Sequence, residues 1–147
     1  MIQKIKYKSN LLAIIVSKRF NKSGVHFFTD DDMSQQLAFM KHPAGKSIQP
    51  HIHNSVPREV QYTQEVLFIK KGKLRVDFFT DKQEYLESRI LESGDVMLLI
   101  QGGHGFEVLE DLEIPVPSLE HQRAIVARID ACADAAKKAR EYAKSLE

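Results

Sequence analysis

The chain of 147 residues has a single cysteine, Cys132, and no tryptophan. One cysteine excludes an intrachain disulfide and any zinc site built from several cysteines. The longest uninterrupted apolar run, Leu11–Val16, has six residues, whereas a membrane-spanning helix needs about 20. The N-terminal residues lack the apolar block and small-residue cleavage site of a signal peptide. These absences favour a cytoplasmic protein without a membrane segment.

An excess of charge of either sign is also missing. The chain has 21 Lys and Arg residues against 20 Asp and Glu residues, which gives a formal net charge of +1. Such a balance gives no reason to expect nucleic acid or an anionic membrane as a partner. Apolar residues make up 43% of the chain and charged residues 28%, a composition too apolar for disorder. We therefore expect a folded domain with its own core.

Residues 1–113 have the pattern of a β protein, with short apolar or alternating segments separated by turn residues. Lys71-Gly72 predicts a tight hairpin in which the glycine takes a positive φ. Evenly spaced short strands predict an all-β sandwich or barrel. The predicted strands are Leu11–Phe20, Val25–Thr29, Gln36–His42, Glu65–Lys70, Lys73–Thr80, Tyr85–Leu91, Val96–Ile100 and Phe106–Leu109.

Residues 114–147 differ in character and predict a C-terminal amphipathic α-helix. Ser118–Glu147 contains neither glycine nor proline, and Ser118 is a suitable N-cap. Apolar residues recur there at steps of three and four. The sequence leaves open whether this helix packs on its own barrel, pairs with a helix of another chain, or frays. The recurring residues are Leu119, Val126, Ile129, Ala133, Ala136 and Ala143.

The segment His51-Ile52-His53 is the most informative in the chain. On a strand, residues i and i+2 project from the same face, so the two imidazoles would point together. That spacing suits two ligands of one metal ion. Glu65 at the start of one predicted strand and His104 after another would complete a set of three imidazoles and one carboxylate.

These residues resemble the first motif of the cupin superfamily. Gly45, His51, His53, Glu65 and Gly72 follow its order, and the intervals from Gly45 to His51 and from Glu65 to Gly72 match the family's spacing. Eleven residues separate His53 from Glu65, more than the family has, which predicts an inserted loop at the barrel mouth.

Glu59 stands nearer to the usual glutamate spacing and is a rival for the fourth ligand. It lacks the downstream glycine and apolar strand of Glu65. Three other residues of the same segment could orient a ligand, namely Arg58, Tyr62 and Gln64.

Gly94, Gly102 and His104 resemble the second cupin motif, with Ile100 in the position of the family's proline and His104 one residue earlier than the family's histidine. The resemblance covers about residues 36–111. It implies a cupin-type double-stranded β-helix, or jelly-roll barrel, for residues 1–113. It also implies one divalent metal ion held by His51, His53, Glu65 and His104. A set of three imidazoles and one carboxylate suits Zn, Fe, Mn, Ni or Co.

The C-terminal part carries a second resemblance. The stretch IPVPSLEHQRAIVARID, which begins at Ile114, is similar to the spacer-helix segment of type I restriction–modification specificity subunits. The DNA-reading domains of that family have no counterpart here, so DNA recognition is not expected. The resemblance implies a helix able to pair with a partner protein through residues 118–146. A natural fusion and an engineered chimera both remain open.

Together these patterns predict a metal-binding cupin that binds or transforms a small sugar-like or carboxylate ligand, with catalytic residues unassigned. A homodimer is expected, because cupins commonly pair and the apolar helix stripe needs cover. The alternative is a module without turnover, which either binds a ligand or mediates protein interaction through its helix.

Overall fold

The computed structural model describes residues 1–53, 55 and 60–115. These residues form nine β-strands and no helix, so this part of the chain has no helix that could cross a membrane. The unit described here is Met1–Ile114. The helix predicted for residues 118–147 lies outside the described residues.

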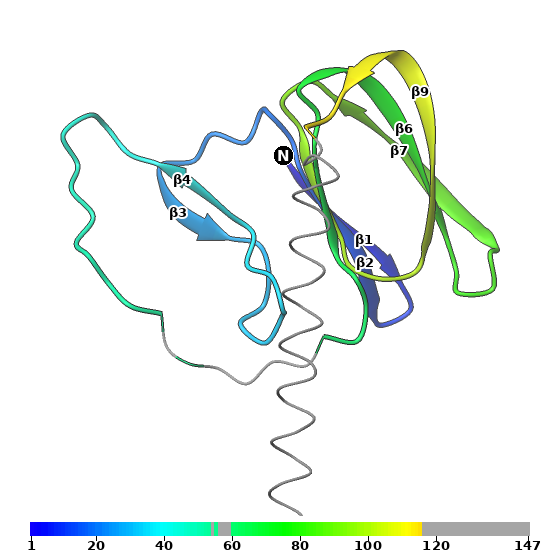
Figure 1. Ribbon diagram of the computed structural model, residues 1–147, viewed down its shortest axis with the longest axis horizontal. Helices are drawn as coiled ribbons and strands as arrows, with labels where there is room; N and C mark the ends of the chain where they lie inside the picture. The colour runs from blue at the N-terminus through cyan, green and yellow to red at the C-terminus, as the bar shows by residue number, and fades with distance from the viewer. Residues whose placement is uncertain (54, 56–59, 116–147) are drawn as a thin grey trace, which may run out of the picture. The chain divides into compact units, whose positions relative to one another are not determined.

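The strands form three antiparallel sheets (Figure 1). Sheet I has the strand order β1-β2-β8-β5, sheet II has the order β7-β6-β9, and β3 and β4 form a two-stranded ribbon. The strands are β1 (Ile2–Tyr7), β2 (Asn10–Val16), β3 (Gly24–Phe27), β4 (Ala38–Lys41), β5 (Glu65–Phe68), β6 (Lys71–Phe79), β7 (Tyr85–Glu92), β8 (Val96–Leu99) and β9 (Gly103–Glu113). The all-β prediction is confirmed, whereas no closed barrel is present among the residues described.

Sheets I and II pack face to face around the main core. On β6 the buried residues alternate with half-buried ones, as expected for a strand with one face in the core. Sheet I contributes residues from all four of its strands to the same cluster. The core residues with the least exposure are Ile5, Ala13, Ile15, Ile69, Leu74, Val76, Phe78, Leu91 and Met97.

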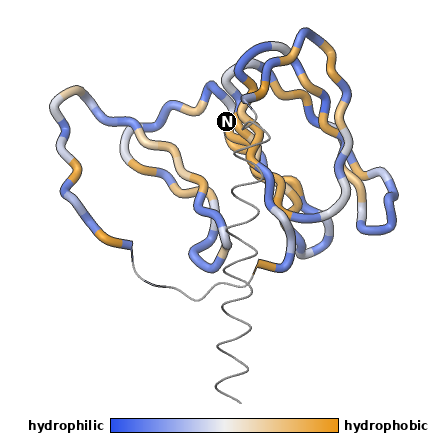
Figure 2. Tube along the Cα trace, in the orientation of Figure 1, coloured by the Kyte–Doolittle hydropathy of each residue, from blue (hydrophilic) through white to orange (hydrophobic). Residues whose placement is uncertain are grey.

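Sheet I is also covered on its outer face, which explains the six-residue apolar run of β2. Ile14, Val16 and Leu98 point away from the main core and pack in a second cluster. Residues of the ribbon and its flanks, such as Phe28 and Phe39, complete that cluster. A strand buried on both faces has no polar alternation, which agrees with the hydrophobic colour of this segment in Figure 2.

The two sheets are linked along both edges, but one edge is linked only near the end of β9, where the backbone N–H of Lys70 donates to the backbone oxygen of Glu113 at 3.0 Å. Along the other edge, Arg89 on β7 donates a hydrogen bond of 2.9 Å from Nε to Oε1 of Gln3 on β1, which links the two edge strands of that side. On the side of the Lys70 hydrogen bond the edge strands are β5 and β9. Phe106 and Val108 of β9 remain 46% and 57% exposed.

The strand register shows that these two β9 side chains face inward. Phe106 is opposite Val76, and Val108 is opposite Leu74. Cross-strand partners share one face of a sheet, and both β6 partners are fully buried in the main core. The inner face of β9 is therefore uncovered where the sandwich opens.

The structure corrects the predicted hairpin at Lys71-Gly72. Strand β5 pairs with β8 and not with β6, so the chain passes there from sheet I to sheet II. The predicted positive φ of Gly72 is confirmed at 90°. A Cβ at Gly72 would lie 2.1 Å from the backbone oxygen of Asp111. Close approach of the β9 backbone at a bulge is therefore the reason for this glycine.

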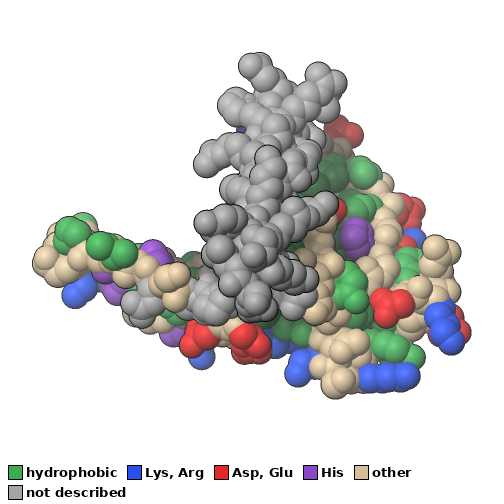
Figure 3. All heavy atoms as spheres, turned by 60° about the horizontal axis from the view of Figure 1, so that its bottom comes forward, with side chains coloured by type: hydrophobic (Ala, Val, Ile, Leu, Met, Phe, Trp, Pro, Cys, Tyr) green, Lys and Arg blue, Asp and Glu red, His purple; other side chains and the backbone are tan. Residues whose placement is uncertain are grey.

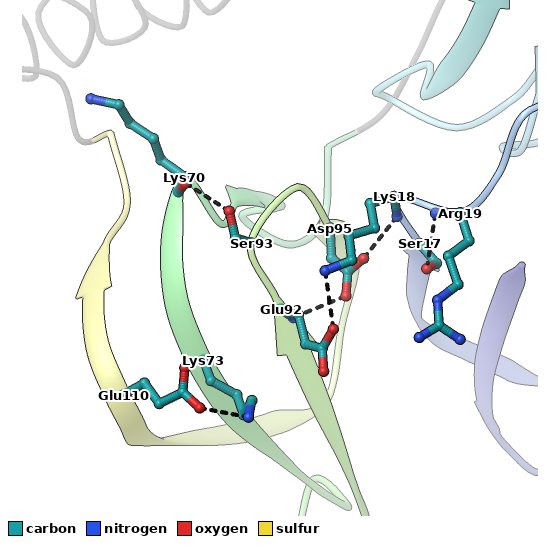
Figure 4. A network of polar contacts seen from close by, with 9 residues as sticks. All are labelled: Ser17, Lys18, Arg19, Lys70, Lys73, Glu92, Ser93, Asp95 and Glu110. Carbon is teal, nitrogen blue, oxygen red and sulfur yellow. Dashed lines mark hydrogen bonds and ion pairs between the residues drawn. The ribbon is translucent and has the colours of Figure 1, made fainter.

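A buried carboxylate fixes the turn that leads into β8 (Figure 4). Asp95 is 7% exposed. Its two carboxylate oxygens accept hydrogen bonds from the backbone N–H groups of Lys18, at 2.8 Å, and Glu92, at 2.9 Å. Side-chain acceptors that satisfy backbone donors in this way stabilise a turn. Asp95 thereby joins the end of β7 to the segment after β2.

Candidate metal centre

Two of the predicted ligands point into the sandwich from opposite sheets. Glu65 begins β5 and is opposite Leu99 of β8, a residue of the main core. His104, near the start of β9, is opposite the buried Phe78 of β6. Because cross-strand partners share a face, both side chains project toward the interior. Thirty-nine positions apart in sequence, they meet at the open edge between β5 and β9.

The two side chains face each other at the rim of the opening. Nε2 of His104 lies 3.7 Å from Oε2 of Glu65, and the side chains are 29% and 53% exposed. This distance exceeds that of a direct hydrogen bond. Two metal–ligand bonds of about 2.0–2.2 Å each would bridge it, so the pair fits a shared divalent ion.

A hollow adjoins His104. It has a volume of about 320 Å³ and is lined by Phe79, Gln83, Gly103 and His104. The rings of His104 and Phe106 lie 5.2 Å apart, centroid to centroid. Phe79 and Gln83 were not predicted from the sequence, because only the pairing of β6 with β9 places this end of β6 beside His104. Gln83 also has a positive φ of 63°, which nothing in its sequence context signals.

His51 and His53 do not lie on a strand, so that part of the prediction is wrong. Both belong to the connection between β4 and β5, and both are exposed. The ring nitrogen Nδ1 of His51 lies 3.1 Å from the backbone oxygen of Gln49. Pro50 directly before the pair has no N–H to give to a sheet ladder, which accounts for the break in strand structure. The two rings are nevertheless close, with centroids 5.3 Å apart.

The four predicted ligands thus form two pairs and not one cluster. In the described part of the chain, no group of three or more His, Cys, Asp or Glu residues is placed to hold a metal ion. Figure 3 likewise shows histidine side chains at separate places on the face it presents. The rival ligand Glu59 lies outside the described residues.

A two-pronged ion pair on β6 has a structural role away from this centre. Arg75 donates two hydrogen bonds of 3.0 Å to the carboxylate of Asp77. The hydrogen bond from Arg75, followed by one from Ser88, lowers the pKa of Asp77 below its ordinary value. Because Arg75 and Asp77 alternate with the buried residues of β6, the pair lies on the outer face.

Comparisons with known protein families, with curated proteins and with solved structures found no match. The predicted resemblance to cupins therefore rests on the motif residues of this chain alone. Among those, the structure brings Glu65 and His104 together and leaves His51 and His53 as a separate pair.

Proposed function

We propose that this protein binds one divalent metal ion in a cupin-like β-sandwich, with His51, His53, Glu65 and His104 as ligands. The observation that carries the proposal is the convergence of Glu65 and His104 on one point from two different sheets. Both residues belong to the cupin motifs, and their placement on inward faces at an open edge is what a metal site in a barrel mouth needs. This edge corresponds to the mouth of the proposed jelly roll.

In this proposal the Glu65–His104 pair is the part of the site held by sheet structure. His51 and His53 would add the remaining ligands from the connection between β4 and β5. That the two histidines already lie side by side favours their acting as one unit. A divalent ion bound there would supply Lewis acidity or an anchor for a chelating ligand.

The hollow that His104 shares with Phe79, which alternates with the buried residues of β6 and so lies on its outer face, is the place we propose for a small ligand. Phe79 supplies an aromatic wall, and Gln83 supplies an amide that can donate and accept hydrogen bonds. A volume of about 320 Å³ lies at the lower end of the range for ligand pockets, about 300–1,000 Å³. We therefore propose a small sugar-like or carboxylate ligand, which the protein binds or transforms.

A second candidate function is helix-mediated protein interaction without turnover. The exposed inner-face residues Phe106 and Val108 of β9 favour a protein contact at this edge, since an unpaired edge strand can pair with another chain. In this alternative the segment 118–146 pairs with a partner protein, or with a second copy in a homodimer.

The identity of the carboxylate ligand provides a direct test. Glu65→Gln keeps the size of the side chain but removes its charge, so we expect Zn²⁺ affinity to fall at least about 10-fold, measured by competition with a chelating dye. Glu59→Gln is the matched control and should leave the affinity within about 2-fold, because in this proposal Glu59 does not touch the ion. A loss confined to Glu59→Gln would assign the ligand to Glu59 and contradict the role of Glu65.

A further inference from the structure

A second hollow lies against the outer face of sheet I. Its volume is about 340 Å³. Its apolar lining includes Met33 and Ile100, which belong to the cluster on that outer face. Glu65 faces the opposite, inner side of the same sheet. The hollow is therefore separate from the Glu65–His104 pair.

An unpaired buried acceptor points to a ligand in this hollow. Oε1 of Gln64, one of the lining residues, is buried and has no hydrogen-bond partner among the described residues. It is the one side-chain atom in the described part of the chain with that property. A buried acceptor without a donor raises the free energy of the protein. A ligand group that donates a hydrogen bond to this oxygen would therefore bind with a favourable free energy.

The rest of the lining indicates what that group is. It contains the carboxylate of Asp32, the hydroxyls of Ser34 and Tyr62, and the amide of Gln101, while its described residues include no Lys, Arg or His. Gln101 is held in place, because its Nε2 donates to the backbone oxygen of Leu11 at 3.2 Å. Carboxylate and amide oxygens accept hydrogen bonds, and none of the described lining residues carries a positive charge that would attract an anion.

We propose that this hollow binds a monosaccharide-sized polyol, with Gln64 accepting a hydrogen bond from a ligand hydroxyl. Its volume lies near the lower limit of about 300 Å³ for ligand pockets, which favours a ligand of one ring. The ring of Tyr62, 57% exposed, provides a flat face against which the carbon–hydrogen side of such a ring can pack. Binding of a ligand in this hollow does not depend on the proposed metal ion.

The test uses the full chain and amide nitrogen–proton correlation spectra. The probes are D-glucose, D-galactose and N-acetyl-D-glucosamine, with ethylammonium and acetate as charged small molecules. At least one monosaccharide should shift the amide signals of Ser34, Tyr62, Gln64 and Gln101. Gln64→Met should weaken that binding about 10-fold, the effect of one lost hydrogen bond. Gln49→Met, a change of an exposed amide outside the lining, should leave it unchanged.

Thermal unfolding of the same variants separates binding from a structural role. Because Oε1 of Gln64 has no partner among the described residues, Gln64→Met should not lower the melting temperature. A lower melting temperature with unchanged monosaccharide affinity would assign Gln64 to the fold and overturn the proposal. No shift with any of the three monosaccharides, or shifts with ethylammonium or acetate alone, would also overturn it. Loss of metal binding in other variants has no bearing on these outcomes.

Discussion

Replacing His104 with alanine is expected to lower the affinity for Zn²⁺ by at least about 10- to 100-fold. Loss of groups that merely support a metal ligand already has an effect of that size. His104 is one of the two residues that meet across the open edge, with its Nε2 facing Oε2 of Glu65. Calorimetric titration of the metal-free protein with Zn²⁺ measures the change.

The matched control is His26→Ala. His26 lies on β3, its Nε2 is 2.9 Å from the backbone oxygen of Ser23, and it has no place in the proposed ligand set. This variant should bind Zn²⁺ as the parent protein does. Equal affinities for His104→Ala and the parent protein would remove His104 from the ligand set. An equal loss in both variants would indicate nonspecific binding to surface histidines.

The second large effect concerns stability. Phe78→Ala is expected to lower the free energy of unfolding by about 3–5 kcal/mol, the range for deleting a buried aromatic ring. Phe78 is 1% exposed in the main core between the two sheets. Urea unfolding gives the free energy, and the slope of the transition shows whether the variant still unfolds in one step.

Phe27→Ala is the control for that measurement. Phe27 lies on β3 of the ribbon and is 65% exposed, so its removal should change the free energy of unfolding by no more than about 0.5 kcal/mol. If Phe78→Ala lowered the free energy of unfolding as little as Phe27→Ala does, the ring of Phe78 would not lie in the core. The packing of sheet I on sheet II described above would then be contradicted. The register that turns His104 inward depends on that packing, since His104 is opposite Phe78.

Sequence patterns predicted the strands well, because each strand has a local signature. Alternating burial along β6 produces a visible period of two. The run Leu11–Val16 was also placed correctly in a strand, although its burial on both faces of sheet I depends on the ribbon and could not be read from the run itself.

The errors arose where long-range contacts decide the structure. Gly72 was correctly given a positive φ, but the cause is the backbone of Asp111 on a distant strand and not a local hairpin. Likewise the spacing of His51 and His53 would align them on a strand, yet no neighbouring strand pairs with this segment in the described structure. Local sequence encodes neither the approach of Asp111 to Gly72 nor whether a strand pairs with the segment of His51 and His53.

The candidate site was predictable in its residues and only partly in its geometry. The motif spacing selected Glu65 and His104, and the sheets place them 3.7 Å apart. The hollow formed by Phe79 and Gln83 needed the pairing of β6 with β9. The acceptor of Gln64 became notable only once its burial was known.

The central claim is that His51, His53, Glu65 and His104 hold one metal ion together. The most direct test is the metal content of protein purified without a histidine tag or chelator, measured by plasma mass spectrometry. The same measurement is made on the His51→Ala/His53→Ala double variant. We predict about one divalent ion per chain in the parent protein and a loss of at least about 10-fold in the double variant. Absence of metal from the parent protein after reconstitution with Zn²⁺, Fe²⁺, Mn²⁺, Ni²⁺ and Co²⁺, or full occupancy in the double variant, would contradict the claim.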